Sequence, residues 1–389
     1  MLKKSSEEAN PEAPIHGDIL DSIVTYLPLI HLVPTSQVSK SWNRGVSTSI
    51  RVNRIKPWLF LHTQKTRPPY STTTTTHAFD PRSHLWIKIT RPTPPPPPHT
   101  SPLRSSHSTL LYMLSPFKFS FSTDPLHAAW HTVDAPAVWR TEPVVALVGH
   151  HVVVAGGGGE FEDDPMSVEM LDTRTGTWDS SCPSMPEAFQ YCKTTTWLSV
   201  AADSDKMYVT DRSTSTTHVF CPNTKTWNGP YTVSIDNHHD ICNFATGFAG
   251  DRLILVGVII GEVEGVKLWE LKLNGETSSL ECFREIGEMP KQLVEEMINE
   301  DGESFGNATS VDVNMAGDVV YVSNKSNPGK VFLCEIGDHG GACDWRRVPN
   351  VVVDDDVRLR ERVVLTCCNV GLGDLHRAMV VEKMEFSVK

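Results

Sequence analysis

The chain has 389 residues, of which 35 are basic and 47 acidic, and its formal net charge is −12 at pH 7. This charge disfavours nucleic acid or an anionic membrane surface as the main partner. The length exceeds the roughly 250–300 residues at which a single hydrophobic core stops growing, so we expect two units, or one repeat-built unit with an appendage.

Targeting signals and membrane spans are not expected. The longest apolar run, Leu253–Ile260, is far shorter than the ~20 residues of a membrane-spanning helix, and it predicts a buried strand. Residues 1–13 are charged and polar, and we expect this N-terminus to be disordered. Nine cysteines without a Cys-x-x-Cys pair fit poorly with a disulfide framework. We therefore expect a reduced protein of the cytoplasm and/or nucleus.

The segment 14–50 has apolar residues three and four positions apart, which is typical of short helices. We expect Asp18 to cap the first helix and Pro28 to end it. Pro34 is expected to end the second helix and to lie in the first turn of a third. One interpretation is a small helical cap on the following domain, because three short helices cannot bury their apolar faces alone.

The same segment resembles an F-box, through residues 17–28 (Gly-Asp-Ile-Leu-Asp-Ser-Ile-Val-Thr-Tyr-Leu-Pro) and 38–44 (Val-Ser-Lys-Ser-Trp-Asn-Arg). In that family the helices pack on a Skp-type adaptor, which bridges to a cullin and its RING partner. The resemblance implies a core position for Trp42. It departs from the family pattern at residues 15–16 and at Pro34, which would weaken adaptor binding. The implied adaptor-binding residues are Ile19, Leu20, Ile23, Leu27, Pro28, Leu32 and Val38.

From Pro57 onward a repeat replaces the helical period. Residues 79–86, 171–178 and 220–227 align without gaps, each with an apolar residue, a polar turn and a Trp seven positions on. This pattern predicts a strand, a tight turn and a second strand that begins with an aromatic anchor. Looser copies extend the series at intervals of 44 to 62 residues. The six anchors are Trp86, Trp130, Trp178, Trp227, Phe283 and Trp345.

The clearest copy, residues 143–186, runs through two apolar strands into Gly156–Gly159 and ends at a Trp, and it resembles a kelch repeat. The resemblance implies a mainly β protein with a six-bladed kelch-type β-propeller at 57–376, preceded by the three-helix F-box. The first blade has three N-terminal strand candidates, at 58–62, 77–79 and 85–89. We predict that a closing strand at about 362–370 completes it, which removes two exposed sheet edges. Residues 377–389 would then form a C-terminal tail.

Two insertions interrupt the repeats. Residues 90–107 are rich in Pro, Ser and Thr and predict an exposed polyproline-II or disordered loop, either as a spacer or as a ligand for an SH3- or WW-type domain. Residues 290–302 predict a short amphipathic helix that docks on the propeller.

No catalytic, cofactor or metal site is expected. Gly156–Gly159 is followed by acidic residues rather than by Gly-Lys-Ser/Thr, which argues against a nucleotide site. The histidine pairs 150–151 and 238–239 are expected in loops, since adjacent strand residues point to opposite faces. Residues 191–192 (Tyr-Cys) lack the set that a copper-radical oxidase needs. In the closing strand, at least one thiol of the pair 367–368 is expected to be buried and inert.

The two resemblances together imply a non-catalytic substrate-recognition subunit of an SCF-type ubiquitin ligase. Its F-box would bind the Skp-type adaptor, and its propeller loops would bind a target protein for degradation. Residues 28–34, 39–44, 56–59 and 78–82 resemble the plant subgroup that acts on phenylpropanoid and flavonoid enzymes such as chalcone synthase. The alternatives are a kelch scaffold outside a ligase, or a propeller enzyme.

Overall fold

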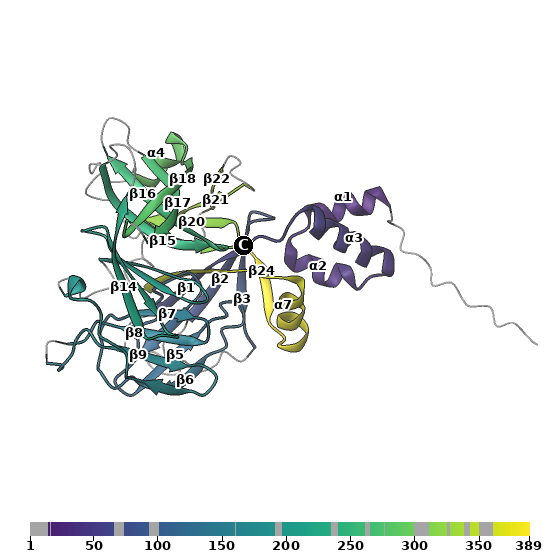
Figure 1. Ribbon diagram of the computed structural model, residues 1–389. Helices are drawn as coiled ribbons and strands as arrows, with labels where there is room; N and C mark the ends of the chain where they lie inside the picture. The colour runs from purple at the N-terminus through teal and green to yellow at the C-terminus, as the bar shows by residue number, and fades with distance from the viewer. Residues whose placement is uncertain are drawn as a thin grey trace, which may run out of the picture.

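The computed structural model describes residues 15, 17–65, 74–92, 101–159, 161–190, 197–234, 240–260, 265–275, 277–298, 311–324, 327–337, 343–349 and 361–389. Three helices come first and a mainly β, propeller-like ring follows, as Figure 1 shows. The helices are α1 (Asp18–Tyr26), α2 (Leu29–Ser36) and α3 (Lys40–Val52). None of the described helices is long and apolar enough to cross a membrane.

The strands of the first half, together with the last two strands of the chain, form three antiparallel sheets. The first has the order β23-β1-β2-β3-β24 and contains β1 (Trp58–Lys65), β2 (Thr74–Asp80), β3 (Leu85–Thr90), β23 (Glu361–Cys368) and β24 (Glu385–Val388). The second contains β4 (Leu111–Leu114), β5 (Lys118–Ser122) and β6 (His131–Asp134). The third contains β7 (Val144–Val148), β8 (His151–Ala155), β9 (Val168–Asp172) and β10 (Thr177–Asp179).

The second half contains two larger units. One is an eight-stranded sheet that joins two four-stranded meanders. The first meander contains β11 (Leu198–Ala202), β12 (Met207–Asp211), β13 (Thr216–Cys221) and β14 (Thr226–Ser234). The second contains β15 (Asp240–Ala249), β16 (Arg252–Ile260), β17 (Gly265–Asn274) and β18 (Ser279–Glu288). The last sheet contains β19 (Val311–Ala316), β20 (Val319–Asn324), β21 (Asn327–Glu335) and β22 (Asp344–Arg347). The short helices are η1 (Glu187–Phe189), α4 (Lys291–Ile298), α7 (Leu372–His376) and η3 (Arg377–Val381).

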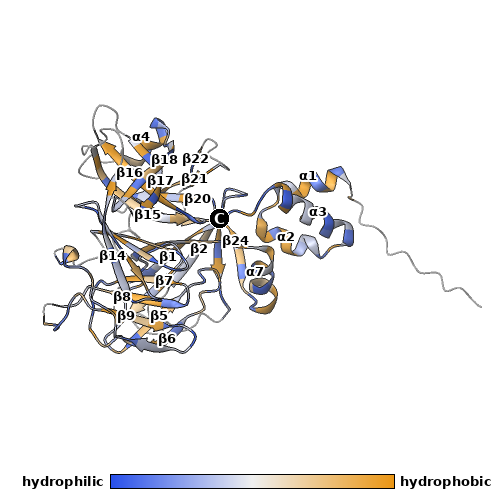
Figure 2. Ribbon diagram, viewed as in Figure 1, coloured by the Kyte–Doolittle hydropathy of each residue, from blue (hydrophilic) through white to orange (hydrophobic). Residues whose placement is uncertain are grey.

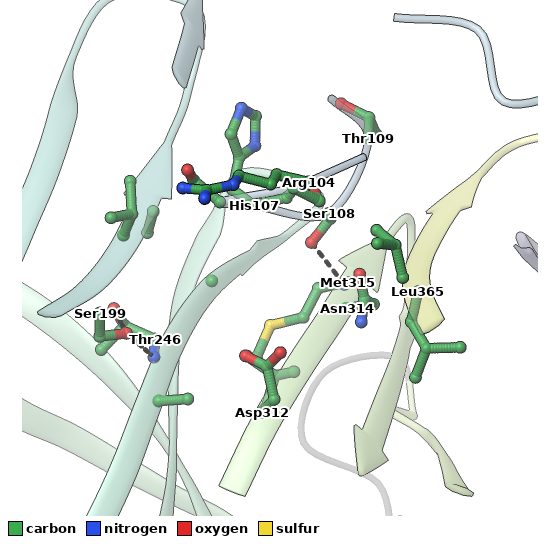
Figure 3. A pocket seen from close by; sticks show the side chains of 18 of the residues that line it. Arg104, His107, Ser108, Thr109, Ser199, Thr246, Asp312, Asn314, Met315 and Leu365 are labelled. Atoms are coloured by element: carbon green, nitrogen blue, oxygen red, sulfur yellow. Dashed lines mark hydrogen bonds between the residues drawn. The ribbon is translucent and has the colours of Figure 1, made fainter. Parts of the chain in front are cut away.

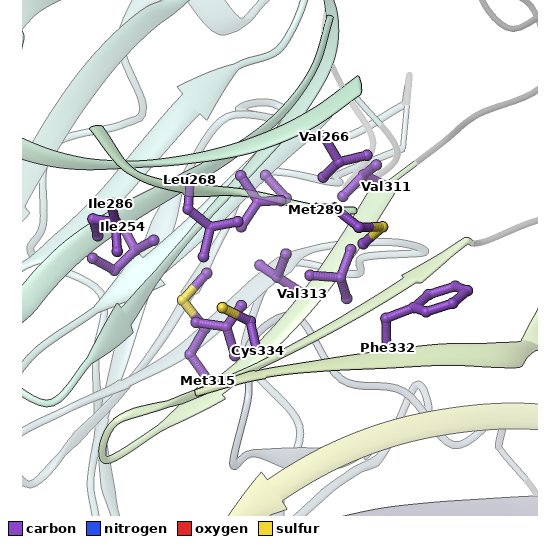
Figure 4. Packing of buried hydrophobic residues seen from close by; sticks show 14 of the residues in the cluster. Ile254, Val266, Leu268, Ile286, Met289, Val311, Val313, Met315, Phe332 and Cys334 are labelled. Carbon is purple, nitrogen blue, oxygen red and sulfur yellow. The ribbon is translucent and has the colours of Figure 1, made fainter. Parts of the chain in front are cut away.

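The described strands therefore form five hydrogen-bonded sheets, whereas the repeat predicts six separate blades. The difference arises where β14 and β18, the last strands of the two meanders, pair in parallel through Thr232–Ser234 and Ser279–Glu281. Both strands are long, with nine and ten residues, so each reaches its neighbour. Between the second meander and the last sheet, residues such as Leu268, Val313 and Phe332 pack together in one hydrophobic core (Figure 4).

The two ends of the chain meet in the first sheet. β23 pairs antiparallel with β1, from Trp58 opposite Cys368 to Lys65 opposite Glu361, close to the position given for the closing strand. Residues 377–389, expected to form a tail, instead fold into η3 and β24, and β24 pairs with β3. They are ordered because Ala378 and Met384 bury apolar surface in the core shared with the N-terminal helices.

The helix boundaries differ from the sequence expectation at two residues. Gly17, with φ 66°, is the N-cap of α1, so Asp18 lies in the first turn and interacts with the helix dipole without capping. Pro34 lies inside α2, and Ser39 caps α3 by accepting a hydrogen bond from the backbone N–H of Trp42 at 3.3 Å. The proline removes one backbone hydrogen bond, which burial of four apolar residues of α2 offsets: Leu29, Ile30, Leu32 and Val33.

Five of the six aromatic anchors pack into the sheets. Trp86 is buried, while Trp130, Trp178, Trp227 and Trp345 are half-buried against core clusters. The indole of Trp178 donates to the carbonyl of Asp134 at 2.9 Å, and that of Trp227 to the carbonyl of Pro183 at 3.3 Å, so each reaches the preceding sheet. Phe283 differs, because its ring is 58% exposed and contacts the Lys272 ammonium at 3.2 Å.

The structure describes the Pro/Ser/Thr-rich insertion, residues 90–107, only in part, because residues 93–100 lie outside the described residues. Residues 103–109, which we call the central segment, cross between sheets instead of forming an exposed loop. Leu103 is fully buried, and its N–H donates to the Gln64 side chain at 2.8 Å. Ser108 accepts from the N–H of Met315 at 2.8 Å and, through its carbonyl, from the N–H of Cys367 at 2.7 Å (Figure 3). These bonds satisfy polar groups that composition alone assigns to solvent.

Candidate interaction surfaces

The helical module presents apolar side chains to solvent. Ile19 is 68% exposed and Ile23 39% on α1, and Val38 is 56% exposed between α2 and α3. Tyr26, which the sequence analysis did not single out, is 85% exposed at the end of α1. Figure 2 shows apolar residues on both α1 and α2, and those of α2 are buried, so the exposed apolar side chains come mainly from α1. We call Ile19, Ile23, Tyr26 and Val38 the helical patch; side chains of this kind are typical of a surface that binds another protein.

The other residues proposed for adaptor contact lie at different depths. Leu20 and Leu32 are buried, at 2% and 0% exposure, in a core that also contains Trp58 of β1 and Leu375 of α7. Leu27 and Pro28 are half-buried. Leu20 and Leu32 therefore support the helical patch from beneath and do not present their side chains on it. Trp42 packs, half-buried, against the same core.

The helical module is fastened to the ring by one turn. The Asp80 carboxylate, at the end of β2, accepts a hydrogen bond from the N–H of Leu29 at 3.1 Å. The Arg82 guanidinium donates to the carbonyls of Val24 and Thr25 at 3.1 and 3.2 Å, and to the hydroxyl of Ser49 at 2.5 Å. Burial lowers the pKa of Arg82, and Asp80 opposes that shift. These bonds cap two helix ends with side chains from the first repeat.

A second packing contact comes from the C-terminus. α7 lies beside α2, as Figure 1 shows, and Leu375 and Ala378 are buried in the core that α1 and α2 share with β1. Polar capping and apolar packing therefore both fix the module, and its orientation follows from the ring.

The ring has two faces, and strand direction identifies them. The helices join at Trp58, the start of β1, which lies opposite Cys368, the end of β23. β23 therefore starts on the face away from the helices. β11, β15 and β19 line the pocket at the centre of the ring together with β23. Equivalent strands of a propeller-like ring run in the same direction, so they start on that face too. The turn between β4 and β5 and the segment before β11 belong to that distal face. It carries four aromatic side chains that are 38% to 103% exposed: Phe117, Trp139, Phe161 and Trp197.

The pocket at the centre of the ring has a volume of about 420 Å³. Its walls come from the four strands named above and from the central segment (Figure 3). The Ser199 and Thr246 hydroxyls lie 3.0 Å apart on neighbouring strands. Its charged groups are Arg104, Glu142, Arg212, Asp312 and Arg362. These residues are far apart in sequence, and no local sequence motif predicts that they lie close together in the fold.

Two histidines expected in loops instead meet a carboxylate. His150 and His151, at the turn into β8, have ligand atoms within 4.8 Å of each other and of Asp172 at the end of β9. Arg174 already occupies this cluster: its guanidinium lies 2.8 Å from His150 Nε2 and 3.7 Å from Asp172 Oδ1. The Arg174 guanidinium thus already contacts two of the three groups that a metal ion would need as ligands. The pairs 191–192 and 238–239 lie outside the described residues.

The cysteines of the closing strand are shielded. Cys367 is fully buried in β23, and burial raises its pKa well above the ordinary value. Burial likewise raises the pKa of Cys368 to about 12. Thiols held protonated in this way are poor nucleophiles.

Comparisons with known proteins identify the family. The F-box/kelch-repeat protein At1g23390 of Arabidopsis thaliana is 42% identical over 378 residues, which cover 94% of this chain and 93% of that protein. No protein-family model matches the chain. Among solved structures, the WD40 domain of Toxoplasma gondii coronin matches with a TM-score of 0.37 and 11% identity, and the match covers 76% of each chain. U3-55K matches with a TM-score of 0.35 and 11% identity, and the match covers 71% of this chain and 78% of U3-55K. Both structural similarities are too weak to identify a family. The identity over nearly the whole length shows that the chain belongs to the F-box/kelch-repeat family.

Proposed function

We propose that this protein is the substrate-recognition subunit of an SCF-type ubiquitin ligase, in which the helical module binds a Skp-type adaptor and the ring binds a target protein. The observation that carries the proposal is the helical patch: Ile19, Ile23, Tyr26 and Val38 expose apolar surface on a module that is hydrogen-bonded to and packed on the ring. Such surface is costly in water unless a partner covers it.

The geometry suits a receptor that performs no bond chemistry. The helical patch and the distal face lie on opposite sides of the ring, so adaptor and target can bind at the same time. A rigid connection would hold target lysines near the ubiquitin-conjugating enzyme, which raises their effective concentration. Further parts of the proposal are a ring of six blades, two of which share the eight-stranded sheet, and a location in the cytoplasm and/or nucleus. The resemblance favours a phenylpropanoid or flavonoid enzyme as target.

Co-purification with a Skp-type adaptor tests the proposal. We expect the full-length chain to retain the adaptor and the double variant Ile19→Asp/Ile23→Asp to lose it, because two carboxylates would have to be buried in an apolar interface. The matched control is Val380→Asp/Val381→Asp, on the C-terminal helical segment, where both side chains are more than half exposed. The control should keep the adaptor. Failure of the unmodified chain to bind any adaptor would exclude the ligase function.

A further inference from the structure

The strongest unassigned feature is the charge balance of the central pocket. Its described lining contains three arginines, Arg104, Arg212 and Arg362, against two carboxylates, Glu142 and Asp312. His107, which also lines the pocket, adds no charge at neutral pH, because burial lowers its pKa to about 4. One positive charge therefore remains, in a chain whose net charge is −12. The pocket is thus positive in an otherwise acidic protein.

Two of the arginines are already partnered. The Arg104 guanidinium donates to the carbonyl of Thr141, and its Nη2 lies 3.8 Å from Glu142 Oε1. Arg212 donates to the carbonyl of Val311 at 3.0 Å, and Asp312 opposes the lowering of its pKa by burial. Even so, Nε of Arg212 is buried and has no hydrogen-bond partner within the described residues. An unsatisfied buried donor is costly, and an acceptor from a ligand would relieve the cost.

Arg362 is the uncompensated charge. Its backbone pairs with Gln64 of β1, but its side chain makes no hydrogen bond or ion pair with any described residue, although it lies at the start of β23 on the pocket wall. Burial, followed by the positive charge of Arg104, lowers its pKa, so the two guanidiniums repel each other. Two cations held close in a partly buried site favour an anion between them.

The position and size of the pocket limit the occupant. About 420 Å³ holds a few side chains or a small anion but no folded element. Arg212 follows β12 at the distal face, and its N–H donates to the carbonyl of Trp197, whose ring is 58% exposed beside it. An extended peptide could therefore place an apolar residue on Trp197 and a carboxylate among the arginines.

We infer that the central pocket binds an acidic side chain from an extended segment of the target protein, with Arg362 as the principal contact and Arg104 and Arg212 beside it. The inference rests on the proposed function and names the chemistry that its target must offer. The hydroxyls of Ser199 and Thr246, which lie 3.0 Å apart, also line the pocket.

Fluorescence polarisation on the full-length chain tests the inference. It compares the affinity of a fluorescein-labelled peptide that contains four consecutive glutamates with that of the same peptide in which glutamines replace them. We expect the glutamate peptide to bind about tenfold more tightly and to weaken as salt rises. Arg362→Gln should reduce its affinity about tenfold, whereas Glu142→Gln, which removes a competing carboxylate, should increase it. Because the two variants act in opposite directions, misfolding cannot account for both. Arg377→Gln, at an exposed arginine outside the pocket, is the control of equal charge change.

The outcomes separate this inference from the proposed function. Equal binding of the two peptides, or glutamate-peptide binding unchanged in Arg362→Gln, overturns the inference. Displacement of the peptide by millimolar inorganic phosphate would assign the pocket to a small anion and would also overturn it. Adaptor co-purification is measured on the same variants and should be unchanged in all of them. If the unmodified chain binds the glutamate peptide but no adaptor, the proposed function fails while the peptide site stands.

Discussion

The carboxylate of Asp80 accepts a hydrogen bond from the backbone N–H of Leu29 at 3.1 Å, and this bond joins the turn between β2 and β3 to the first turn of α2. Asp80 is 1% exposed and also accepts from the N–H of Arg82 at 3.0 Å and the hydroxyl of Ser83 at 2.9 Å. One side chain thus organises its own β-turn and caps a helix 51 residues earlier in the chain.

Asp80→Ala should therefore destabilise both parts together. It leaves three donors without their acceptor, and we expect a loss of about 3 kcal/mol in the free energy of unfolding, measured by urea titration. Asp172→Ala is the matched control, because Asp172 has the equivalent position in the third sheet. Its carboxylate accepts a hydrogen bond from the N–H of Arg174 in its own turn. The control should lose clearly less stability. Equal losses would contradict a capping role for Asp80.

The buried ion pair under the glycine loop gives a second prediction. Arg140 and Glu169 are 0% and 2% exposed, with Nη2 and Oε2 3.0 Å apart, and Arg140 also donates to the carbonyl of Gly156 at 2.7 Å. Glu169→Leu leaves a buried cation unpaired, so we expect a loss of about 3–5 kcal/mol. The double variant Arg140→Met/Glu169→Leu should lose less than the sum of the single variants. Additive losses in this double-mutant cycle would show that the two side chains act independently.

Removal of the C-terminal strands should have graded effects. A chain that ends at residue 360 lacks β23, so β1 loses its partner and Ser108 loses the N–H of Cys367. We expect this chain to aggregate or to unfold without cooperativity, because sheet edges are exposed. A chain that ends at residue 384 lacks only β24, at the outer edge of the first sheet, and should stay monomeric and cooperative. Size-exclusion chromatography and urea unfolding distinguish the two; a monomeric, cooperative 1–360 chain would disprove ring closure by β23.

His62 predicts a pH dependence of stability. Its imidazole lies between the hydroxyls of Thr76 and Thr366, at 3.3 and 3.0 Å, and burial, aided by Arg91, lowers its pKa from 6.5 to about 3. The folded protein therefore stays unprotonated at this site while the unfolded chain takes up a proton below pH 6.5. Stability from this group is present above pH 6.5 and is lost as the pH falls towards 3.

The corresponding variant is His62→Gln. Between pH 5.5 and 4, it should reduce the slope of unfolding free energy against pH by about 1.4 kcal/mol per pH unit. Urea titrations at several pH values measure both slopes. If the slopes of the two proteins coincide, His62 is not the neutral buried group described here.

Sequence patterns predicted features that depend on near neighbours. The spacing of Trp178 and Trp227 from their turns predicted strand pairs, because a tight turn and a fixed period act locally. Other features needed contacts between distant residues. The helical period does not distinguish the exposed Ile19 from the buried Leu20, since the difference depends on Trp58 and α7. Pro34 is tolerated in α2 for the same reason, as burial of its neighbours outweighs one missing bond.

The central pocket was out of reach of sequence reasoning. Arg104 lies in the central segment, Arg212 follows β12 and Arg362 lies in β23, and each alone resembles an ordinary surface arginine. The composition of residues 90–107 predicted an exposed or disordered loop, whereas Leu103 is buried and its N–H donates to the Gln64 side chain. Only the closed arrangement of the strands brings these groups together.

The shared core of the N-terminal helices and α7 also bears on biosynthesis. The ribosome makes α1 to α3 first, but Leu375 and Ala378, which cover α2, are made among the last residues. Helices this short are marginal in water without their packing partners. During translation the helical module is therefore fully packed only after the C-terminal residues have been made. A product shortened by a premature stop codon would carry the F-box sequence but would lack the residues that support its docking surface.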